Sequence, residues 1–526
     1  MDKDTNFPRR ETLFSLDRKD TAFAICAVAE CIFTSALGLF EGFNLGFCLS
    51  AVVMLVLFTL YFSGKNRVGA YPAVCGGLAL LLSAVFVCTS NGSVRFFSII
   101  MILLLALIFF SGLLRGDTRG NQSTLGVFST ALATIERIPM AIKSLFSNEN
   151  GNKKTVGKVL VGVLCAVPVL AVVIPLLLSS DDAFHGMMTD LFSNTKTAIA
   201  KTVIGLLLSP AVVAYGFSSK KGVTTEKVAR ERKGVENAYL ISFLAVISLC
   251  YVLYLFSQLA YFFSAFQGFL PEGGMTYAHY ARKGFFEMCV IAVINLVLVF
   301  VSLMIAKKEK GSVCIAVKGL TTFIAVFTLI IVATAVSKMV LYIGTYGMTV
   351  LRVTTSAFML FVTVVFISVI LRIYMHRINI IKVALVTAGS ILLILGLTNV
   401  NALCARYNYE SYLSGRLQTV DAEELYRLGD EGVPYLVELA SGPESPVATE
   451  AQKYLAMTYI YRHLDAVDFY EDFTLADLEE AHRQEGFARF SIPRARAYKS
   501  LHRYLQTNPQ FGSSYQNAVA KAAYLE

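Results

Sequence analysis

Tryptophan is absent from this chain of 526 residues, and charged residues make up only 16% of it. A soluble domain of ordinary composition has about a quarter charged residues. The chain is instead 56% hydrophobic, and its mean hydropathy is +0.61. This composition excludes an ordinary soluble domain and indicates a protein that is largely surrounded by lipid.

Catalytic and metal-binding signatures are missing as well. No G-x-S-x-G, H-E-x-x-H or P-loop motif lies in a suitable context. None of the ten cysteines follows Cys404, and their spacing fits neither a metal site nor a disulfide framework. We therefore expect no cofactor and no bound metal, and an enzyme is the weakest of the functional hypotheses.

Long apolar stretches fill the chain from residue 21 to about residue 400. Each has about 20 or more residues, which as a helix can cross a hydrocarbon core of roughly 30 Å. The predicted spans are 21–40, 43–63, 69–89, 95–114, 156–178, 199–218, 238–263, 284–306, 314–342, 349–374 and 380–401. The sequence thus predicts an all-α fold, a polytopic transmembrane helix bundle of about 11 spans followed by a small all-α soluble C-terminal domain.

The predicted division is a cytoplasmic N-terminal segment at 1–20, the helix bundle at 21–404 and an extracytoplasmic helical domain at 405–526. Basic residues supply the orientation, because loops rich in Lys and Arg stay in the cytoplasm. These residues gather in the N-terminal segment and in the loops 64–68, 115–158, 219–237, 307–310 and 372–382. The opposite loops hold only Arg95, Lys196, Lys201, Arg282, Lys283 and Arg352. With an odd number of spans, the N-terminus is predicted inside and the C-terminal domain outside.

The concentration of Lys and Arg in one set of loops explains the formal net charge of +9. Basic residues at membrane boundaries face anionic lipid headgroups. We therefore expect membrane lipids as partners, and no nucleic acid.

From about residue 405 the pattern changes to short amphipathic helices. Asp421 with Glu424 resembles a capping box, and Pro434 and Pro446 suit the first turns of helices. A domain of about 120 residues can bury its own core. Two interpretations stay open: a module that senses or binds a protein partner or ligand, and a cap that packs on the outer face of the bundle.

The densest polar cluster, YAHYARKGFFEMCVIAVIN at 277–295, enters the eighth predicted span. Lys283 and Glu287 are four residues apart on one helix face, and Arg282 lies within reach of Glu287. A charge deep in a span costs about 2.5–3.5 kcal/mol, so Glu287 is expected to be paired. The cluster is either an ion-coupled or substrate-binding site, or an interfacial ion pair with snorkelling basic residues.

Other polar residues are also candidates for a functional role. Lys338 and Arg352 reach the same leaflet as Glu287, so either can pair with it, and Glu30 is an acid within the first span that has no obvious local partner. On the outer face, Asp181, Asp182 and His185 form a further candidate motif. Such residues can bind a metal, but a capped interfacial helix beginning near residue 180 explains them better.

Four segments carry a family resemblance. They are LLLSSDDAF at 176–184, YARKGFFE at 280–287, TYGMTVLRV at 345–353 and NALCARYNYESYL at 401–413. With these segments the chain resembles a family of bacterial multi-pass membrane proteins, domain of unknown function 4173, which is related to family 4153. The resemblance implies a bacterial plasma-membrane protein and gives weight to Arg282, Glu287 and Arg352, but it implies no activity, substrate or cofactor.

Two functional hypotheses follow. The first is a sensor, regulatory or envelope-associated protein whose outer helical domain binds a partner. The second is a transporter or lipid-handling protein that uses Glu287, Lys338 and Arg352 in a cavity, although no inverted repeat is evident.

Overall fold

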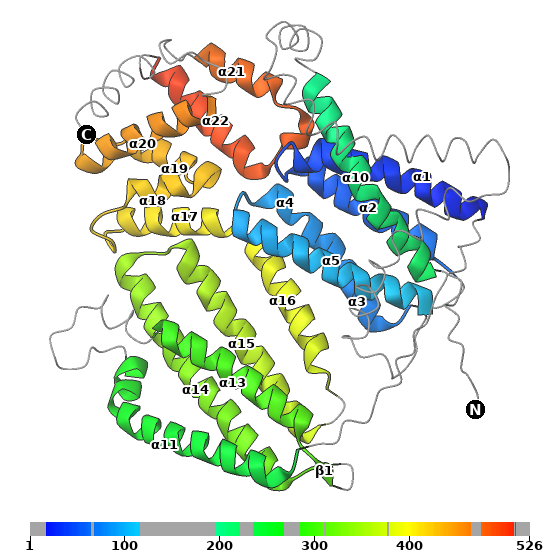
Figure 1. Ribbon diagram of the computed structural model, residues 1–526. Coiled ribbons are helices and arrows are strands. Elements are labelled where there is room, and N and C mark those ends of the chain that lie inside the picture. Colours follow the sequence, from blue (N-terminus) through cyan, green and yellow to red (C-terminus); the bar gives the residue numbers. More distant parts are fainter. Residues whose placement is uncertain are drawn as a thin grey trace, which may run out of the picture. The chain divides into compact units, whose positions relative to one another are not determined.

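The computed structural model confirms an all-α, polytopic architecture (Figure 1). It describes residues 17–64, 68–115, 195–220, 235–267, 285–309, 312–375, 378–463, 475–509 and 511. Within these ranges, 10 helices are long and apolar enough to cross a membrane. These helices are Arg18–Leu39, Leu45–Phe62, Ala70–Cys88, Gly92–Leu114, Ala198–Lys220, Asn237–Ser257, Glu287–Ile305, Ile315–Tyr346, Val350–Tyr374 and Ile380–Leu397.

Each of these helices coincides with one of the predicted spans. The helix is favoured because it satisfies its own backbone donors and acceptors, which lipid cannot do. The remaining predicted span, 156–178, lies outside the described residues. The chain is therefore a multi-pass membrane protein.

By its internal contacts the chain forms two compact units. Unit 1 comprises Met1–Val87, Arg95–Glu226 and Glu485–Ser491. Unit 2 comprises Cys88–Val94, Lys227–Gln484 and Ile492–Glu526. A short segment of the C-terminal region, 485–491, thus packs with the N-terminal helices, whereas the helices on either side of it belong to unit 2.

Unit 1 begins with a helical hairpin. Helix α1 (Arg18–Phe33) continues directly into a π-helix, η1 (Thr34–Leu39), and α2 (Leu45–Phe62) follows. Asp17 and Asp20 form a capping box at the start of α1, which satisfies backbone N–H groups that the first turn leaves open. Between the helices the chain turns through Gly42, whose φ is 87°, a conformation that glycine adopts without strain.

The other elements that lie wholly or mostly in unit 1 are α3 (Ala70–Ser83), α4 (Val85–Cys88), α5 (Gly92–Arg115), α10 (Thr195–Lys220) and the 3-10 turn η3 (Phe487–Arg489). The ring of Phe23 stacks on that of Tyr61 with centroids 3.8 Å apart. Helices α1 and α10 approach closely at Gly205, where an added Cβ would lie 2.4 Å from the Cα of Ile32. Small residues permit such close approach of helices where no water is present to drive association.

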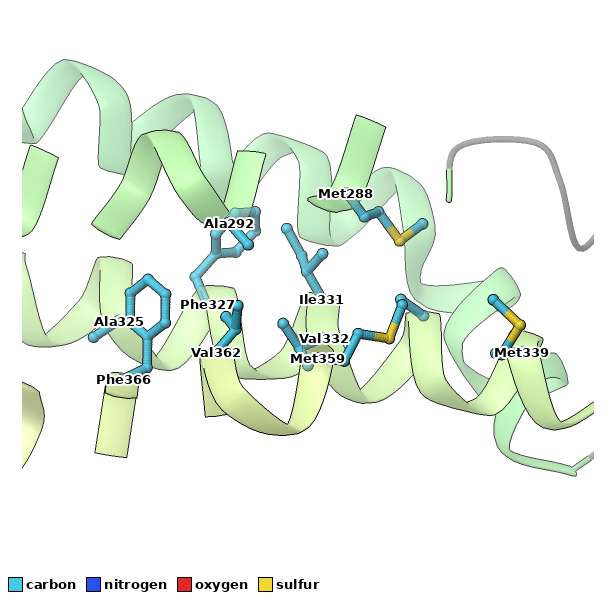
Figure 2. Packing of buried hydrophobic residues seen from close by; sticks show 11 residues of the cluster. Met288, Ala292, Ala325, Phe327, Ile331, Val332, Met339, Met359, Val362 and Phe366 are labelled. Atoms are coloured by element: carbon cyan, nitrogen blue, oxygen red, sulfur yellow. The ribbon is translucent and has the colours of Figure 1, made fainter. Parts of the chain in front are cut away.

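The membrane helices of unit 2 are α11 (Asn237–Gln267), α13 (Phe285–Ile305), α14 (Ile315–Tyr346), α15 (Val350–Tyr374) and α16 (Ile380–Leu397). Two short antiparallel strands, β1 (Lys308–Glu309) and β2 (Ser312–Val313), join α13 to α14. Figure 2 shows the apolar core in which Met288 of α13, Ile331 of α14 and Met359 of α15 meet.

One polar network crosses this apolar region. Asn295 of α13 accepts a hydrogen bond from the Tyr251 hydroxyl at 2.5 Å and donates one to Thr328 at 2.9 Å. Asn295 is fully buried. Interhelical hydrogen bonds of this kind hold α11, α13 and α14 together at the depth of the membrane.

The C-terminal helices are α17 (Val400–Leu413), α18 (Ala422–Arg427), η2 (Gly429–Glu431), α19 (Val433–Ala440), α20 (Pro446–His463), α21 (Leu475–Gln484) and α22 (Ile492–Thr507). Asp421 caps α18 by accepting from the Glu424 amide at 3.1 Å. Pro434 lies in the first turn of α19, and Pro446 begins α20. The predicted helix starts at these three positions are confirmed.

The close contact at Gly205 gives a testable prediction. Gly205→Ala should destabilise the protein by about 1–3 kcal/mol, because the new methyl group meets backbone atoms that cannot rotate away. The measurement is thermal unfolding of the detergent-solubilised protein, followed by circular dichroism. The matched control is Gly77→Ala in α3, where a Cβ meets nothing within 4 Å. Equal unfolding temperatures for the two variants would contradict the packing of α1 against α10.

Candidate functional site

Three acidic side chains lie along the first hairpin of unit 1, at its beginning, middle and turn. They are Asp20, Glu30 and Glu41. Both end positions are paired with basic residues of α10, whereas the middle one is bound by hydroxyl groups.

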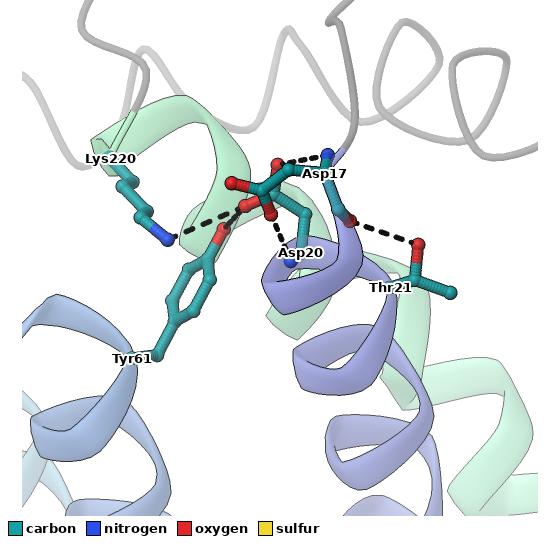
Figure 3. Close-up of polar contacts among 5 residues, drawn as sticks. All are labelled: Asp17, Asp20, Thr21, Tyr61 and Lys220. Atoms are coloured by element: carbon teal, nitrogen blue, oxygen red, sulfur yellow. Dashed lines mark hydrogen bonds and ion pairs between the residues drawn. The ribbon is translucent and has the colours of Figure 1, made fainter.

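Asp20 lies at the beginning of α1 and is fully buried (Figure 3). Its carboxylate accepts hydrogen bonds from the Tyr61 hydroxyl at 2.9 Å and from the Asp17 amide at 3.0 Å. The Lys220 ammonium lies 3.4 Å from the same carboxylate and 3.9 Å above the Tyr61 ring. The cost of removing a charge from water must be offset by hydrogen bonds and ion pairs of this kind. The cluster therefore joins the ends of α1, α2 and α10 and leaves little of the carboxylate for a ligand.

Glu30 lies in the middle of the first span, and only 6% of it is exposed. The Thr34 hydroxyl donates to its carboxyl group at 3.3 Å and lies 2.7 Å from the Ser50 hydroxyl of α2. Thr34 is also the first residue of the π-helix η1. Single π-helical turns are rare and occur frequently at functional sites. The predicted candidate Glu30 is thus an acid within a predicted span whose contacts are the hydroxyl groups of Thr34 and Ser50.

Glu41 lies in the turn between η1 and α2. It pairs with Lys201 of α10 at 2.6 Å and with Arg489 at 2.5 Å. The hydrogen bond from Lys201 holds the pKa of Glu41 below its ordinary value of 4.5, against the opposing effect of burial. Next to it, the Leu45 amide donates to the Phe490 carbonyl at 3.1 Å. The segment 485–491 is therefore attached to the first hairpin by an ion pair and a backbone hydrogen bond.

In unit 2 the predicted residues Glu287, Lys338 and Arg352 do not form one ion-paired cluster. The side chain of Glu287 is exposed, and no ion pair joins it to either basic residue in the described part of the chain. Lys338 is buried in α14. Arg352 donates to the carbonyls of Tyr346 and Gly347 and stacks 4.1 Å from the Tyr342 ring. Arg352 therefore stabilises the turn between α14 and α15.

A small crevice lies between α13, α14 and α15, lined by apolar residues that include Met288, Cys289 and Phe358. Its volume is about 10 Å³, which is roughly the room of a single water molecule. A space of this size cannot hold an organic substrate. Among the described residues this crevice therefore gives no support to a transport cavity built around Lys338 and Arg352.

A polar network of unit 2 fastens the C-terminal helices to two turns between spans. Asn408 of α17 donates to the Met348 carbonyl at 2.8 Å and accepts from its amide at 2.7 Å. At the other turn, Asn401 accepts from the Asn91 amide group at 2.7 Å. Glu431, which is buried, accepts from the Ser90 amide at 2.8 Å and also from the Ser90 hydroxyl.

Asn399 completes this network. Its side chain donates to the Cys88 carbonyl at 2.8 Å and accepts from the Thr89 hydroxyl at 3.2 Å. Its backbone has a φ of 52°, in the left-handed region that asparagine tolerates better than most residues. The same side chain caps α17 by accepting from the Ala402 amide at 3.2 Å.

Five of the predicted residues, Arg282, Lys283, Asp181, Asp182 and His185, lie outside the described residues. Within the described part of the chain, no group of three or more His, Cys, Asp or Glu side chains has the arrangement to hold a metal ion. The expectation that the protein binds no metal stays a prediction.

Sequence reasoning did not identify Asp20, Tyr61 and Lys220, or the asparagines of the C-terminal network, as partners. The D-x-x-D pattern at 17–20 before an apolar run is a capping signal that points to Asp20. For the other residues the contacts join positions that are distant in the sequence, such as Asn91 and Asn401. No local sequence pattern predicts such contacts.

The comparisons with known proteins identify a family and no activity. The model of the family described as Domain of unknown function (DUF4153) matches residues 76–439, well over half of the chain. The chain therefore belongs to this family. No curated protein and no solved structure matches the chain. The resemblance to family 4153 is confirmed, and the closer relation to family 4173 stays a prediction.

The ion pair between Glu41 and Arg489 gives a prediction with a defined pH dependence. Glu41→Gln should lower stability by about 1 kcal/mol at neutral pH, the range of a partly exposed ion pair. Because the pKa of Glu41 is lowered by folding, its stabilisation is complete above 4.5 and is lost as the pH falls through the lowered value. The difference between wild type and variant, measured by thermal unfolding, should therefore disappear on acidification.

The control for this measurement is Glu410→Gln. Glu410 pairs with Arg406 one helical turn away, and both side chains are exposed. This substitution should leave the unfolding temperature unchanged. A Glu41→Gln variant that unfolds like wild type at neutral pH would show that the segment 485–491 is not held by this pair.

Proposed function

We propose that this integral membrane protein is a sensor or regulatory protein of the bacterial plasma membrane, with its N-terminus in the cytoplasm. In this proposal the C-terminal helices lie on the outer side, bind a partner or ligand and pass its state to the membrane helices. The observation that carries the proposal is the polar network through which α17 and η2 bind the turns at 88–91 and 346–348. Positive-inside orientation assigns both turns to the outer side.

Contacts within unit 2 support the sidedness of this proposal. Asn91 contacts Asn401 and Met348 contacts Asn408, and both asparagines belong to the single helix α17. The two turns therefore lie on the same side, which requires an even number of crossings between them. The described helices supply five, from Gly92–Leu114 to Ile315–Tyr346. One further crossing, as the sequence predicts at 156–178, makes the number even.

Contacts within unit 1 also require one crossing more than the described spans supply. These contacts lie at the face where α2 and α10 end. Tyr61 and Lys220 both bind Asp20, so the ends of α2 and α10 lie on one side. Three described spans separate Tyr61 from Lys220, and again one more crossing makes the number even. Both requirements support eleven spans, with the two termini on opposite sides.

The outer position of the C-terminal region is directly testable. A fusion of alkaline phosphatase after residue 526 should be active, because this enzyme folds only outside the cytoplasm, and a fluorescent protein fused there should stay dark. A fusion after Lys220, at the face of Asp20, should give the opposite pattern. A fluorescent C-terminal fusion would place the helical region in the cytoplasm and overturn the proposal.

The coupling between the helical region and the spans is testable with Asn408→Ala. The substitution removes two hydrogen bonds to Met348, each worth about 1 kcal/mol. In cells that lack the endogenous protein, the variant should insert at normal levels but fail to reverse the phenotype that the wild-type protein reverses. Arg406→Ala, on the same helix with an exposed partner, should reverse it. Equal rescue by both variants would show that signals do not pass through this contact.

A further inference from the structure

Glu30 lies at the middle depth of the membrane. Ten residues separate it from Asp20, which corresponds to about 15 Å along a helix and to about half of a hydrocarbon core of roughly 30 Å. Asp20 and Glu41 lie at the two ends of the hairpin with their own ion pairs. An acid at middle depth is a candidate functional site by default, because the bilayer makes an unneutralised charge expensive there.

The side chains that the structure describes in α1, α2 and α10 include no basic partner for Glu30. Helix α2 contains no Lys or Arg. On α10, Lys201 pairs with Glu41 and Lys220 pairs with Asp20. The titratable or charged side chains of α1, the turn, α2 and α10 are Arg18, Lys19, Asp20, Cys26, Cys31, Glu41, Cys48, Tyr61, Lys196, Lys201, Tyr215 and Lys220. Among the basic residues of this set whose side chains the structure describes, none forms an ion pair with Glu30.

Two hydroxyl groups contact the Glu30 carboxyl group instead. Thr34 donates to it at 3.3 Å, and Ser50, which is 2% exposed, also interacts with it. One residue further along the π-helix, the fully buried Ser35 hydroxyl has no hydrogen-bond partner among the described residues. Carboxylate and hydroxyl oxygens suit hard cations and protons, and they do not suit soft transition metals.

We propose that Glu30, with the hydroxyls of Thr34 and Ser50, forms a binding site for one small monovalent cation, a proton or Na⁺, at the middle of the membrane. The bound cation neutralises the carboxylate, which no basic side chain reaches in the described part of the chain. The π-helix that begins at Thr34 holds the hydroxyl beside the carboxyl group. This inference is independent of the sensing function proposed above, since the site lies entirely within unit 1.

The test uses the full-length protein in phospholipid nanodiscs and infrared spectroscopy, which separates the C=O stretch of a protonated carboxyl from that of a carboxylate. Spectra are taken from about pH 5 to about pH 10, with Na⁺ or with choline as the cation. A protonated-carboxyl band that is lost as the pH rises, and that Glu30→Gln removes completely, identifies a proton site. Loss of the same band on adding Na⁺ at constant pH identifies a sodium site.

Glu41→Gln is the matched control, because Glu41 lies outside the span and should not contribute to this band. Ser50→Ala and Thr34→Val each remove one oxygen and should shift the midpoint of the titration without removing the band. A band from Glu30 that neither pH nor Na⁺ changes would show a permanently neutral structural acid and overturn the proposal. If Glu30→Gln fails to fold, the shift caused by Ser50→Ala assigns the band instead, and an unshifted midpoint counts against the site.

Discussion

The exclusion of water from the bilayer core restricts where each charged side chain of this protein can lie. A charge at the centre of a span costs about 2.5–3.5 kcal/mol, and at the ends this cost disappears. Helix α10 shows this restriction, since its paired lysines lie near its two ends. Lys201 and Lys220 are separated by about 28 Å at a rise of 1.5 Å per residue. This distance is close to the hydrocarbon thickness of roughly 30 Å. Each lysine meets an acid of the first hairpin at its own end, so the two ion pairs are about one hydrocarbon thickness apart along the helix.

The same constraint explains how much of the fold could be predicted. Apolar runs identify spans because lipid tolerates little else, and all 10 described spans coincide with predicted ones. The starts of α18, α19 and α20 followed from Asp421, Pro434 and Pro446, because caps and first-turn prolines act locally. The partners of the charged side chains could not be predicted in this way. Asp20 and Lys220 are 200 residues apart, and only the packing of α1 on α10 brings them together.

The residues predicted to form a polar cluster show that side-chain charge and position in the sequence do not determine which residues pair. Glu287, Lys338 and Arg352 were grouped because their positions in the sequence reach one leaflet, but helix rotation decides which face each side chain occupies. Glu287 is exposed, and Arg352 binds the carbonyls of the turn before its own helix. Glu30 was selected because it lacked a local partner, and its hydroxyl partner Ser50 comes from the neighbouring helix α2. Both candidates stay predictions, and the structure shows only which side chains each of these residues contacts.

The C-terminal network connects the C-terminal helices physically to the ends of the spans. Helix ends leave backbone amides and carbonyls without intrahelical partners. An asparagine side chain both donates and accepts, so Asn408 satisfies the amide and the carbonyl of Met348 at once. Asn399 binds the Cys88 carbonyl at the end of α4 and caps its own helix α17. Movement of α17 would expose these groups again, so any displacement of this helix must also change the backbone contacts at the ends of the spans that it binds.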